Sequence, residues 1–305
     1  MQAIKIHDRL VEHPTADYII LAGPTAVGKT ETVMSLAEDH DIEIISGDSR
    51  QVYRYMDIGT ATPDENLLRR FPHHLINELT PDLVWNAADF SHRARELIQD
   101  ILKRNKLPVV IGGAGLYLDA LRFGLFDERI KDLKVRQKYQ RRVDAGEAES
   151  LWQELMELDP GYAETFHFNN HKKLMRAFEI YETTGLPPSR VFRQNSDPFI
   201  KKDLFIVLDR ERSLLYERIN HRVLDMLEQG LVGECQRLLE LGYRSDLYPL
   251  KTIGYKEVFS LLSGEIDQAE MIRLIQKNTR NFAKRQLTWF RNHPFDEWID
   301  LDNNE

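Results

Sequence analysis

Cysteine is almost absent from this chain: Cys235 is the only one among 305 residues. A lone cysteine cannot close an internal disulfide, which fits a reducing compartment. Because Cys235 lies in the helical stretch GLVGECQRLLEL, we interpret it as a buried packing residue rather than a nucleophile. Long apolar runs are also missing, since none approaches the roughly 20 residues of a membrane helix, and the opening stretch MQAIKIHDRLVEHP lacks an apolar signal core. We therefore expect a cytoplasmic protein with no membrane partner.

The sequence also lacks histidines and cysteines at the spacing of metal ligands. His73 and His74 are adjacent, and no other histidine or cysteine stands at a zinc-binding distance from them in the sequence. We expect no zinc site. The sequence also contains no internal repeat and no low-complexity segment, and nothing in it resembles a coiled coil or an exposed pairing surface. This is the pattern of a monomer.

Carboxylates are missing from the stretch between Met271 and His293, which carries six cations: Arg273, Lys277, Arg280, Lys284, Arg285 and Arg291. The formal net charge of −8 disfavours a polyanionic partner, but the charge is segregated. A second basic run covers residues 171–176, whereas the C-terminal stretch 296–305 is acidic. Phe282, Trp289 and Phe290 interleave with the cations, as suits a stacked nucleic-acid strand, although core packing is the favoured reading for both phenylalanines.

The most informative motif is GPTAVGKT, whose residues are Gly23, Pro24, Thr25, Ala26, Val27, Gly28, Lys29 and Thr30. It follows an apolar run at 18–22 and precedes a helical pattern that begins at Lys29, which is the order of a phosphate-binding P-loop of nucleotide- and ATP-binding proteins. Glycines let backbone N–H groups surround one anion, the lysine adds charge, and the threonine hydroxyl can reach a magnesium ion. The motif predicts a site for a di- or triphosphate.

Short apolar runs predict strands at 18–22, 42–46, 107–111, 204–208 and 298–301, with helical patterns between them such as 87–104 and 214–241. This alternation predicts an α/β fold, a P-loop NTPase-like parallel sheet covered by helices. From 126 to 200 the strands stop, and we expect a helical insertion domain that contacts a second substrate. The catalytic core would then consist of 1–125 and 201–305.

Asp48 follows the second predicted strand, at the end of the sheet where ligands collect in such folds. A carboxylate opposite a phosphate cradle can hold magnesium or accept a proton from a nucleophile, or it can simply cap the next helix. Gln51 carries both a donor and an acceptor, the combination that reads a base edge. The turn 112–115 ends a third strand, so three regions converge on one crevice.

The acidic residue that normally follows a strand and helps to hold the metal in P-loop NTPases is missing. The strand at 107–111 runs directly into Gly112 and Gly113, and Asp209 comes late in a charged turn, where we do not expect a metal ligand. This weakens ATP hydrolysis as the function. Arg218 and Arg222 share one helix face, where they could neutralise a diphosphate or form surface salt bridges.

Seven segments in order resemble the tRNA dimethylallyltransferase family, also called IPP transferases, over nearly the whole chain: GPTAVGKT, DSRQVYRYMDIGTATP, PHHLI, GGAGLYLDAL, RVLDMLEQGL, TIGYKE and TRNFAKRQLTWFR. The resemblance implies alkyl transfer, in which an adenosine amine beside the tRNA anticodon attacks dimethylallyl diphosphate and diphosphate leaves. The P-loop would hold that diphosphate with Mg2+ on Thr30, which explains the missing acid. Asp48 would be the general base, while Thr25 and Arg222 would bind the diphosphate.

The resemblance also implies contacts with the anticodon stem-loop of tRNA. Carried over to this chain, they fall on Asp48, Ser49, Arg50, Gln51, Ala114, Lys172, Lys173, Leu174, Met175, Arg176, Lys251, Thr252, Ile253, Gly254, Tyr255, Lys256, Lys284, Arg285, Gln286, Trp289 and Arg291. Some positions depart from the family pattern. Ala114 replaces a threonine and Thr62 a lysine, and Arg50 and Tyr55 are unusual beside Asp48, so we expect fine details of substrate contact to differ, but not the reaction class.

Three alternative functions remain. An adenylate isopentenyltransferase would use the same chemistry on a free nucleotide, but it would need neither the basic stretch 271–293 nor the insertion. A P-loop small-molecule kinase would consume ATP. An RNA-binding nucleotide switch would need a base-recognition motif such as Asn-Lys-x-Asp, which the chain does not contain.

Overall fold

The computed structural model describes residues 12–124, 132–194 and 198–302. The chain divides into two compact units, one formed by Met1–Arg122 with Phe199–Glu305 and the other by Phe123–Pro198. The second unit covers the stretch for which the sequence predicts a helical insertion, although the predicted boundary at 125/126 lies outside the described residues.

The first unit contains a parallel six-stranded sheet in the order β3-β2-β4-β1-β5-β6. Its strands are β1 (Tyr18–Ala22), β2 (Ile42–Ser46), β3 (His73–His74), β4 (Leu107–Gly112), β5 (Asp203–Asp209) and β6 (Glu297–Asp300). The predicted fold class is confirmed, because β1, β2 and the centre of β5 are buried on both faces, as a covered parallel sheet requires. The two-residue strand β3 escaped prediction because it is too short to carry a pattern.

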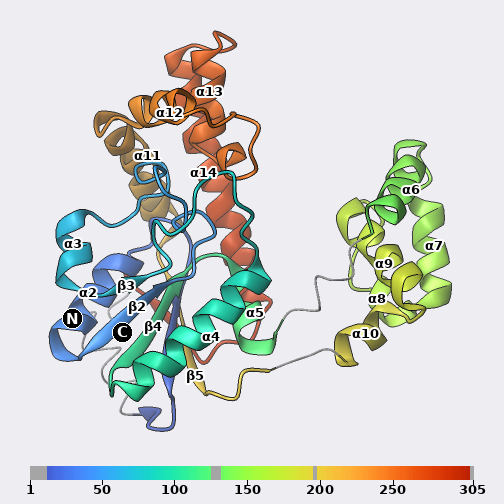
Figure 1. Cartoon of the computed structure of the whole chain (residues 1–305), viewed down its shortest axis with the longest axis horizontal. Coiled ribbons are helices and arrows are strands. Elements are labelled where there is room, and N and C mark those ends of the chain that lie inside the picture. The colour runs from blue at the N-terminus through green and yellow to red at the C-terminus, as the bar shows by residue number, and fades with distance from the viewer. Residues whose placement is uncertain (1–11, 125–131, 195–197, 303–305) are drawn as a thin grey trace. The chain divides into compact units, whose positions relative to one another are not determined.

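Helices cover both faces of this sheet (Figure 1). The first unit contains α2 (Lys29–Asp39), α3 (Glu65–Arg70), α4 (Ala87–Lys103), α5 (Gly115–Phe123), α11 (Arg212–Glu228), α12 (Leu231–Glu240), the short 3-10 helix η1 (Pro249–Lys251), α13 (Tyr255–Leu262) and α14 (Gln268–Arg291). On one face, α4 and α5 pack through apolar residues such as Phe90 and Leu118. On the other, Val33 of α2 and Ile219 of α11 join the strand residues in one core.

A second core lies beyond the carboxyl ends of the strands. It combines the loop after β2, represented by Val52 and Met56, with α12, α13 and the start of α14. Cys235 is buried in this core, and burial raises the pKa of its thiol, as expected for a packing residue rather than a nucleophile. The second core therefore fixes the loop that carries Asp48 against the C-terminal helices.

The second unit is helical, with α6 (Leu133–Asp144), α7 (Ala148–Leu158), α8 (Pro160–Ala163), α9 (His171–Thr184) and α10 (Pro188–Gln194). Its own core includes Tyr139, Leu151 and Leu174, and the rings of Tyr139 and Phe178 stack at 4.6 Å. In the described part of the chain, no helix combines the length and apolar character that crossing a membrane requires.

Candidate functional site

The P-loop joins β1 to α2 through a tight turn in which several residues adopt left-handed backbone angles. Gly23 has φ +148° and Gly28 has φ +118°, and a Cβ at Gly23 would stand 2.6 Å from the carbonyl oxygen of Leu208. Ala26 has φ +63°, an uncommon value for a residue with a side chain. These angles bend the backbone around the start of α2, so that the loop and the helix N-terminus surround one point.

Lys29 begins α2 and its ammonium closes this loop from the inside. It donates to the carbonyl oxygens of Gly23 at 2.9 Å and Pro24 at 2.8 Å. Burial, followed by repulsion from Arg222, lowers the pKa of Lys29 to about 7, against the attraction of Asp48 and Glu31. A cation destabilised in this way gains strongly from a bound anion, because the anion supplies the missing charge partner.

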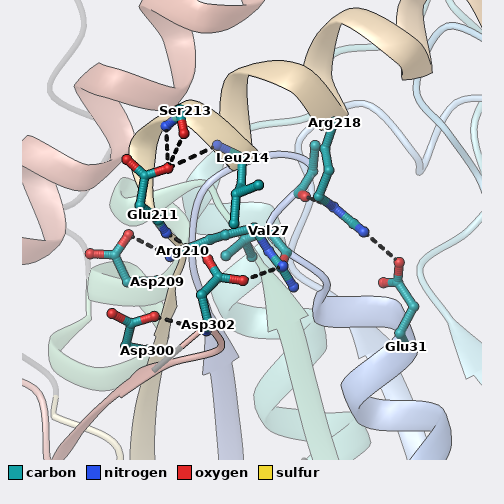
Figure 2. A network of polar contacts seen from close by, with 11 residues as sticks. Val27, Glu31, Asp209, Arg210, Glu211, Ser213, Leu214, Arg218, Asp300 and Asp302 are labelled. Atoms are coloured by element: carbon teal, nitrogen blue, oxygen red, sulfur yellow. Dashed lines mark hydrogen bonds and ion pairs between the residues drawn. The ribbon is translucent and has the colours of Figure 1, made fainter. Parts of the chain in front are cut away.

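Two arginines hold the loop through its backbone carbonyls (Figure 2). Arg218 of α11 donates its Nε–H to the carbonyl of Ala26 at 2.8 Å and forms an ion pair with Glu31 at 2.7 Å. Arg210, which follows β5, donates its Nε–H to the carbonyl of Val27 at 3.1 Å. Arg218 also lines the cavity, so its ion pair with Glu31 leaves a contact with diphosphate open as well.

Arg222 lies one helical turn after Arg218, lines the same cavity and contacts a different residue of the loop. Its Nη1 lies 3.3 Å from the hydroxyl oxygen of Thr25, to which it donates. Burial lowers the pKa of the Arg222 guanidinium, and the Asp48 carboxylate is the first charge that raises it. Arg222, Lys29 and Asp48 therefore share one electrostatic environment, although they come from three separate segments.

Gln286 of α14 ties the P-loop to the end of β4. Its side-chain oxygen accepts the N–H of Thr25 at 2.9 Å, and its side-chain nitrogen donates to the carbonyl of Gly113 at 2.9 Å. A Cβ at Gly113 would stand 2.3 Å from that nitrogen, so a side chain there would displace the Gln286 amide. Because the amide is engaged at both ends, Gln286 supports the loop in this structure, a role that the sequence did not reveal.

Asp48 follows β2, and its Oδ1 accepts the backbone N–H of Arg50 at 2.7 Å. No described helix begins there, so helix capping does not explain this residue. The ends of β2 and β4 meet closely, since a Cβ at Gly112 would stand 2.5 Å from the carbonyl oxygen of Gly47. This close approach places Asp48 at the same edge of the sheet as the P-loop.

Gln51 braces the loop that follows. Its side-chain oxygen accepts the Ser46 hydroxyl at 2.8 Å, and its side-chain nitrogen donates to the carbonyls of Thr60 at 3.3 Å and Ala61 at 3.2 Å. The amide that we expect to read a base is thus engaged within the protein in this structure.

Glu234 of α12 binds the backbone of the same loop, a role for which sequence reasoning did not single it out. Its carboxylate accepts the N–H groups of Asp57 at 2.8 Å, Ile58 at 2.7 Å and Gly59 at 3.1 Å, together with the Tyr255 hydroxyl at 2.6 Å. The Tyr255 ring presses on the backbone, because a Cβ at Gly59 would stand 2.3 Å from it. The only available signal was DIGTATP itself, whose successive N–H groups need an acceptor.

A cavity of about 730 Å3 lies between these segments. Its wall includes residues 25–31, Asp48, Gln51, residues 60–61, Arg222 and Gln286, with the apolar side chains of Met34, Ile44, Ile76 and Ile111 beside them. The crevice predicted from three strand ends is therefore formed by the first unit. It combines a cationic phosphate cradle, a carboxylate and apolar surface, which suits a substrate with an anionic head and an apolar part.

A family model described as IPP transferase matches residues 51–293 of this sequence. The chain belongs to the IPP transferase family. Among curated proteins, the tRNA dimethylallyltransferase of Thermotoga neapolitana is 45% identical over 282 residues, covering 92% of each chain. The tRNA dimethylallyltransferase 1 of Trichlorobacter lovleyi is 44% identical over 287 residues, covering 94% of each.

Solved structures of IPP transferases match the fold as well. The tRNA isopentenylpyrophosphate transferase of Bacillus halodurans superimposes with a TM-score of 0.68 at 40% identity, covering 93% of this chain and 89% of that one. A eukaryotic dimethylallyltransferase solved while acting on tRNA gives a TM-score of 0.76 at 28% identity, covering 93% of this chain and 73% of that one.

The tRNA contacts that the family resemblance implies differ widely in exposure. In the second unit, Lys172 and Lys173 of α9 are exposed, whereas Leu174 and Met175 are buried in that unit's core. Arg176 is half-buried and pairs with Glu179 at 2.7 Å. Buried side chains cannot touch RNA while the unit stays folded, which leaves the lysines as the accessible part of this segment.

Residues 251–256 of the first unit show the same division between exposed and buried side chains. Lys251 and Lys256 are exposed, Thr252 and Ile253 are half-buried, and Gly254 and Tyr255 are buried. The Tyr255 side chain belongs to the second core, and an RNA contact of this residue stays a prediction.

On α14, Lys284, Arg285 and Arg291 are exposed, whereas Trp289 is half-buried. Its ring fills the space above Gly115, where a Cβ would stand 2.3 Å from the indole, and it stacks on His293 at 3.7 Å. Ala114, Ser49 and Arg50 are half-buried near the strand ends, and the Arg50 guanidinium lies 4.6 Å from the centroid of the exposed Tyr248 ring.

Proposed function

We propose that this IPP transferase moves a dimethylallyl group from dimethylallyl diphosphate to the exocyclic amine of an adenosine beside the tRNA anticodon. The observation that carries the proposal is the shared environment of Lys29, Arg222 and Asp48 in one cavity. Such a cavity has cations for a leaving diphosphate and a carboxylate for the proton of the amine. The tRNA dimethylallyltransferases that the chain resembles over more than nine-tenths of its length support the same reaction.

In the transfer, the amine nitrogen forms a bond to the allylic carbon, and the bond from that carbon to the diphosphate oxygen breaks. Negative charge grows on the leaving diphosphate, so donors that are already oriented stabilise the transition state more than the bound substrate. We assign this role to the backbone of residues 23–30 with Lys29, and to Arg222 with Thr25 at the bridging oxygens. The apolar wall beside the cradle suits the dimethylallyl group.

The amine loses one proton when its new bond forms, and we assign Asp48 as the general base that accepts it. Its Oδ1 already accepts the N–H of Arg50, which fixes the carboxylate. The other oxygen is then the acceptor for the amine proton. Because a stacked adenine cannot reach the cavity, the target nucleotide must turn out of its stack and enter it.

Magnesium fits this site as a companion of the diphosphate. Within the described ranges, His, Cys, Asp and Glu side chains nowhere gather in groups of three that would hold a metal, so its ligands would come largely from the substrate. Thr30 is exposed, lines the cavity and offers the hydroxyl that a P-loop gives to Mg2+. A bound Mg2+ would neutralise charge on the diphosphate oxygens.

For tRNA, we propose contacts through the exposed cations of both units, Lys172, Lys173, Lys251, Lys256, Lys284, Arg285 and Arg291. Phosphate contacts of this kind position an RNA and make its affinity depend on salt.

The proposal is tested with labelled dimethylallyl diphosphate, Mg2+ and either unmodified tRNA or free AMP. We expect label in tRNA and none in AMP. Label in AMP alone would identify an adenylate isopentenyltransferase, and label in neither would exclude prenyl transfer to both acceptors. A parallel reaction with labelled ATP tests the kinase alternative, for which we expect no ATP consumption.

A further inference from the structure

Arg210 and Asp302 connect the last strand of the sheet to the P-loop backbone at Val27 (Figure 2). Arg210 donates its Nε–H to the carbonyl of Val27, and its Nη1 pairs with Oδ1 of Asp302 at 2.6 Å. The other Asp302 oxygen accepts the N–H of Glu211 at 2.7 Å. The side chains of Arg210 and Asp302 are only 15% and 16% exposed, so this pair is better shielded than a surface salt bridge.

The peptide between Val27 and Gly28 is the part of the cradle that this contact holds. In a trans peptide the C=O and the N–H point in opposite directions, so fixing the Val27 oxygen against Arg210 fixes the opposite direction of the Gly28 N–H. Gly28 has φ +118°, and a glycine has little resistance of its own to rotation of this peptide. If the peptide turned over, a carbonyl oxygen would point toward the anion in place of an N–H.

We propose that Asp302 is a positioning residue that acts through Arg210 and holds the Val27–Gly28 peptide in its anion-binding orientation. This rests on the proposed function in one respect, that a diphosphate occupies the cradle. The packing supports it, since a Cβ at Gly28 would stand 3.3 Å from Leu301 and 3.6 Å from Arg210, which enclose this glycine. The C-terminal segment thereby becomes part of the diphosphate site although it supplies none of its ligands.

A rival explanation is that Arg210, which also lines the cavity, contacts the diphosphate directly. The two explanations predict opposite effects of Asp302→Ala. If Arg210 binds the anion, removal of its carboxylate partner frees the guanidinium and tightens binding. If Asp302 positions the loop, the same change loosens Arg210 and weakens binding.

The test is calorimetric titration of inorganic diphosphate with Mg2+ into the full chain, well below the unfolding temperature. We expect Asp302→Ala to weaken diphosphate binding by about 3- to 10-fold, the scale of one hydrogen bond. Asp302→Glu should recover part of the affinity. Glu211→Gln is the matched control, because it removes a neighbouring carboxylate that caps α11 without touching the loop, and its affinity should equal that of the wild type.

Steady-state kinetics give a second readout. The Michaelis constant for dimethylallyl diphosphate should rise in Asp302→Ala, whereas that for tRNA should not change. Equal or tighter diphosphate binding by Asp302→Ala, with binding by the wild type intact, would overturn the positioning role alone. An Asp302→Ala protein that melts earlier but binds diphosphate normally would do the same, since it would show a purely structural contact. Failure of the wild type to bind diphosphate would overturn the proposed function together with this inference.

Discussion

Two walls of the same cavity are supported in opposite ways. The anion wall, defined here as residues 23–30 with Arg222, is held mainly by donors: Arg210 and Arg218 on its carbonyls and Lys29 inside it. The base wall, defined as Asp48, Gln51 and residues 57–62, has its N–H groups held by the carboxylate of Glu234. Donors that bind the carbonyl oxygens of the anion wall turn the N–H groups of the same peptides toward the substrate. On the base wall, the Glu234 carboxylate accepts the N–H groups of the loop, and Asp48 lines the cavity.

This difference teaches that the two walls can be disturbed separately. Changes in the base wall should reduce alkyl transfer and spare diphosphate binding, whereas changes in the anion wall should reduce diphosphate binding first.

Asp48→Asn is expected to give the largest difference between the loss of alkyl transfer and the loss of diphosphate binding. The asparagine oxygen can still accept the Arg50 N–H, but the side chain no longer takes a proton. Single-turnover transfer should fall by roughly 100-fold or more, as for the loss of a general base. Diphosphate affinity should stay within about twofold, since no anion contact is lost. Transfer at nearly the wild-type rate would show that Asp48 is structural.

On the anion wall, Lys29→Met should weaken diphosphate binding by roughly tenfold or more, because a charge-assisted contact is removed. It should also stabilise the ligand-free protein. The pKa of Lys29 is about 7 when folded and 10.5 ordinarily, so the unfolded chain binds more protons between these values. The contribution of Lys29 to wild-type stability therefore rises with pH from about 7 to 10.5.

The stabilisation by Lys29→Met should accordingly be largest below pH 7 and fade as the pH rises toward 10.5. Chemical denaturation of both proteins over this range measures it. A difference independent of pH would contradict a destabilised lysine charge.

A smaller effect on the base wall is expected from Glu234→Gln. The amide keeps one acceptor oxygen but loses the charge that holds three N–H groups, so the loop should shift and transfer slow by about tenfold. Diphosphate affinity should not change. Tyr255→Phe is the graded control, because it removes a single hydrogen bond to the same carboxylate. If Glu234→Gln weakened diphosphate binding as much as transfer, the two walls would not be separable.

The smallest effect is expected outside the cavity. Lys172→Ala and Lys284→Ala should each raise the Michaelis constant for tRNA a few-fold, with a reduction of about one in the salt slope of binding. Neither should alter diphosphate affinity. Lys103→Ala on α4, an exposed lysine with no expected RNA role, is the control. Salt titrations of tRNA binding measure the slopes, and an unchanged slope would remove that lysine from the RNA surface.

Local sequence patterns predicted most of the features that residues of a single segment form. The strands at 18–22 and 42–46 and the P-loop were readable because burial on both faces leaves an unbroken apolar run and because a phosphate cradle needs glycine at fixed positions. Asp48 was found by its place at a strand end. An RNA contact of Tyr255 stays a prediction, since a family motif does not distinguish a residue that supports the site from one that touches substrate, and the structure shows that this side chain is buried.

The sequence by itself determined the fold class, the anion cradle and the chemical character of its neighbours, because each depends on residues close together along the chain. Only the tertiary structure decided what holds them in place. Gln286 meets Thr25 across 261 residues, Glu234 meets Asp57 across 177, and Asp302 meets Arg210 across 92. The physical reason is that bent loops leave backbone groups without partners in their own segment, and distant side chains satisfy them. Which side chain arrives there is fixed by how the helices and the last strand pack on the sheet.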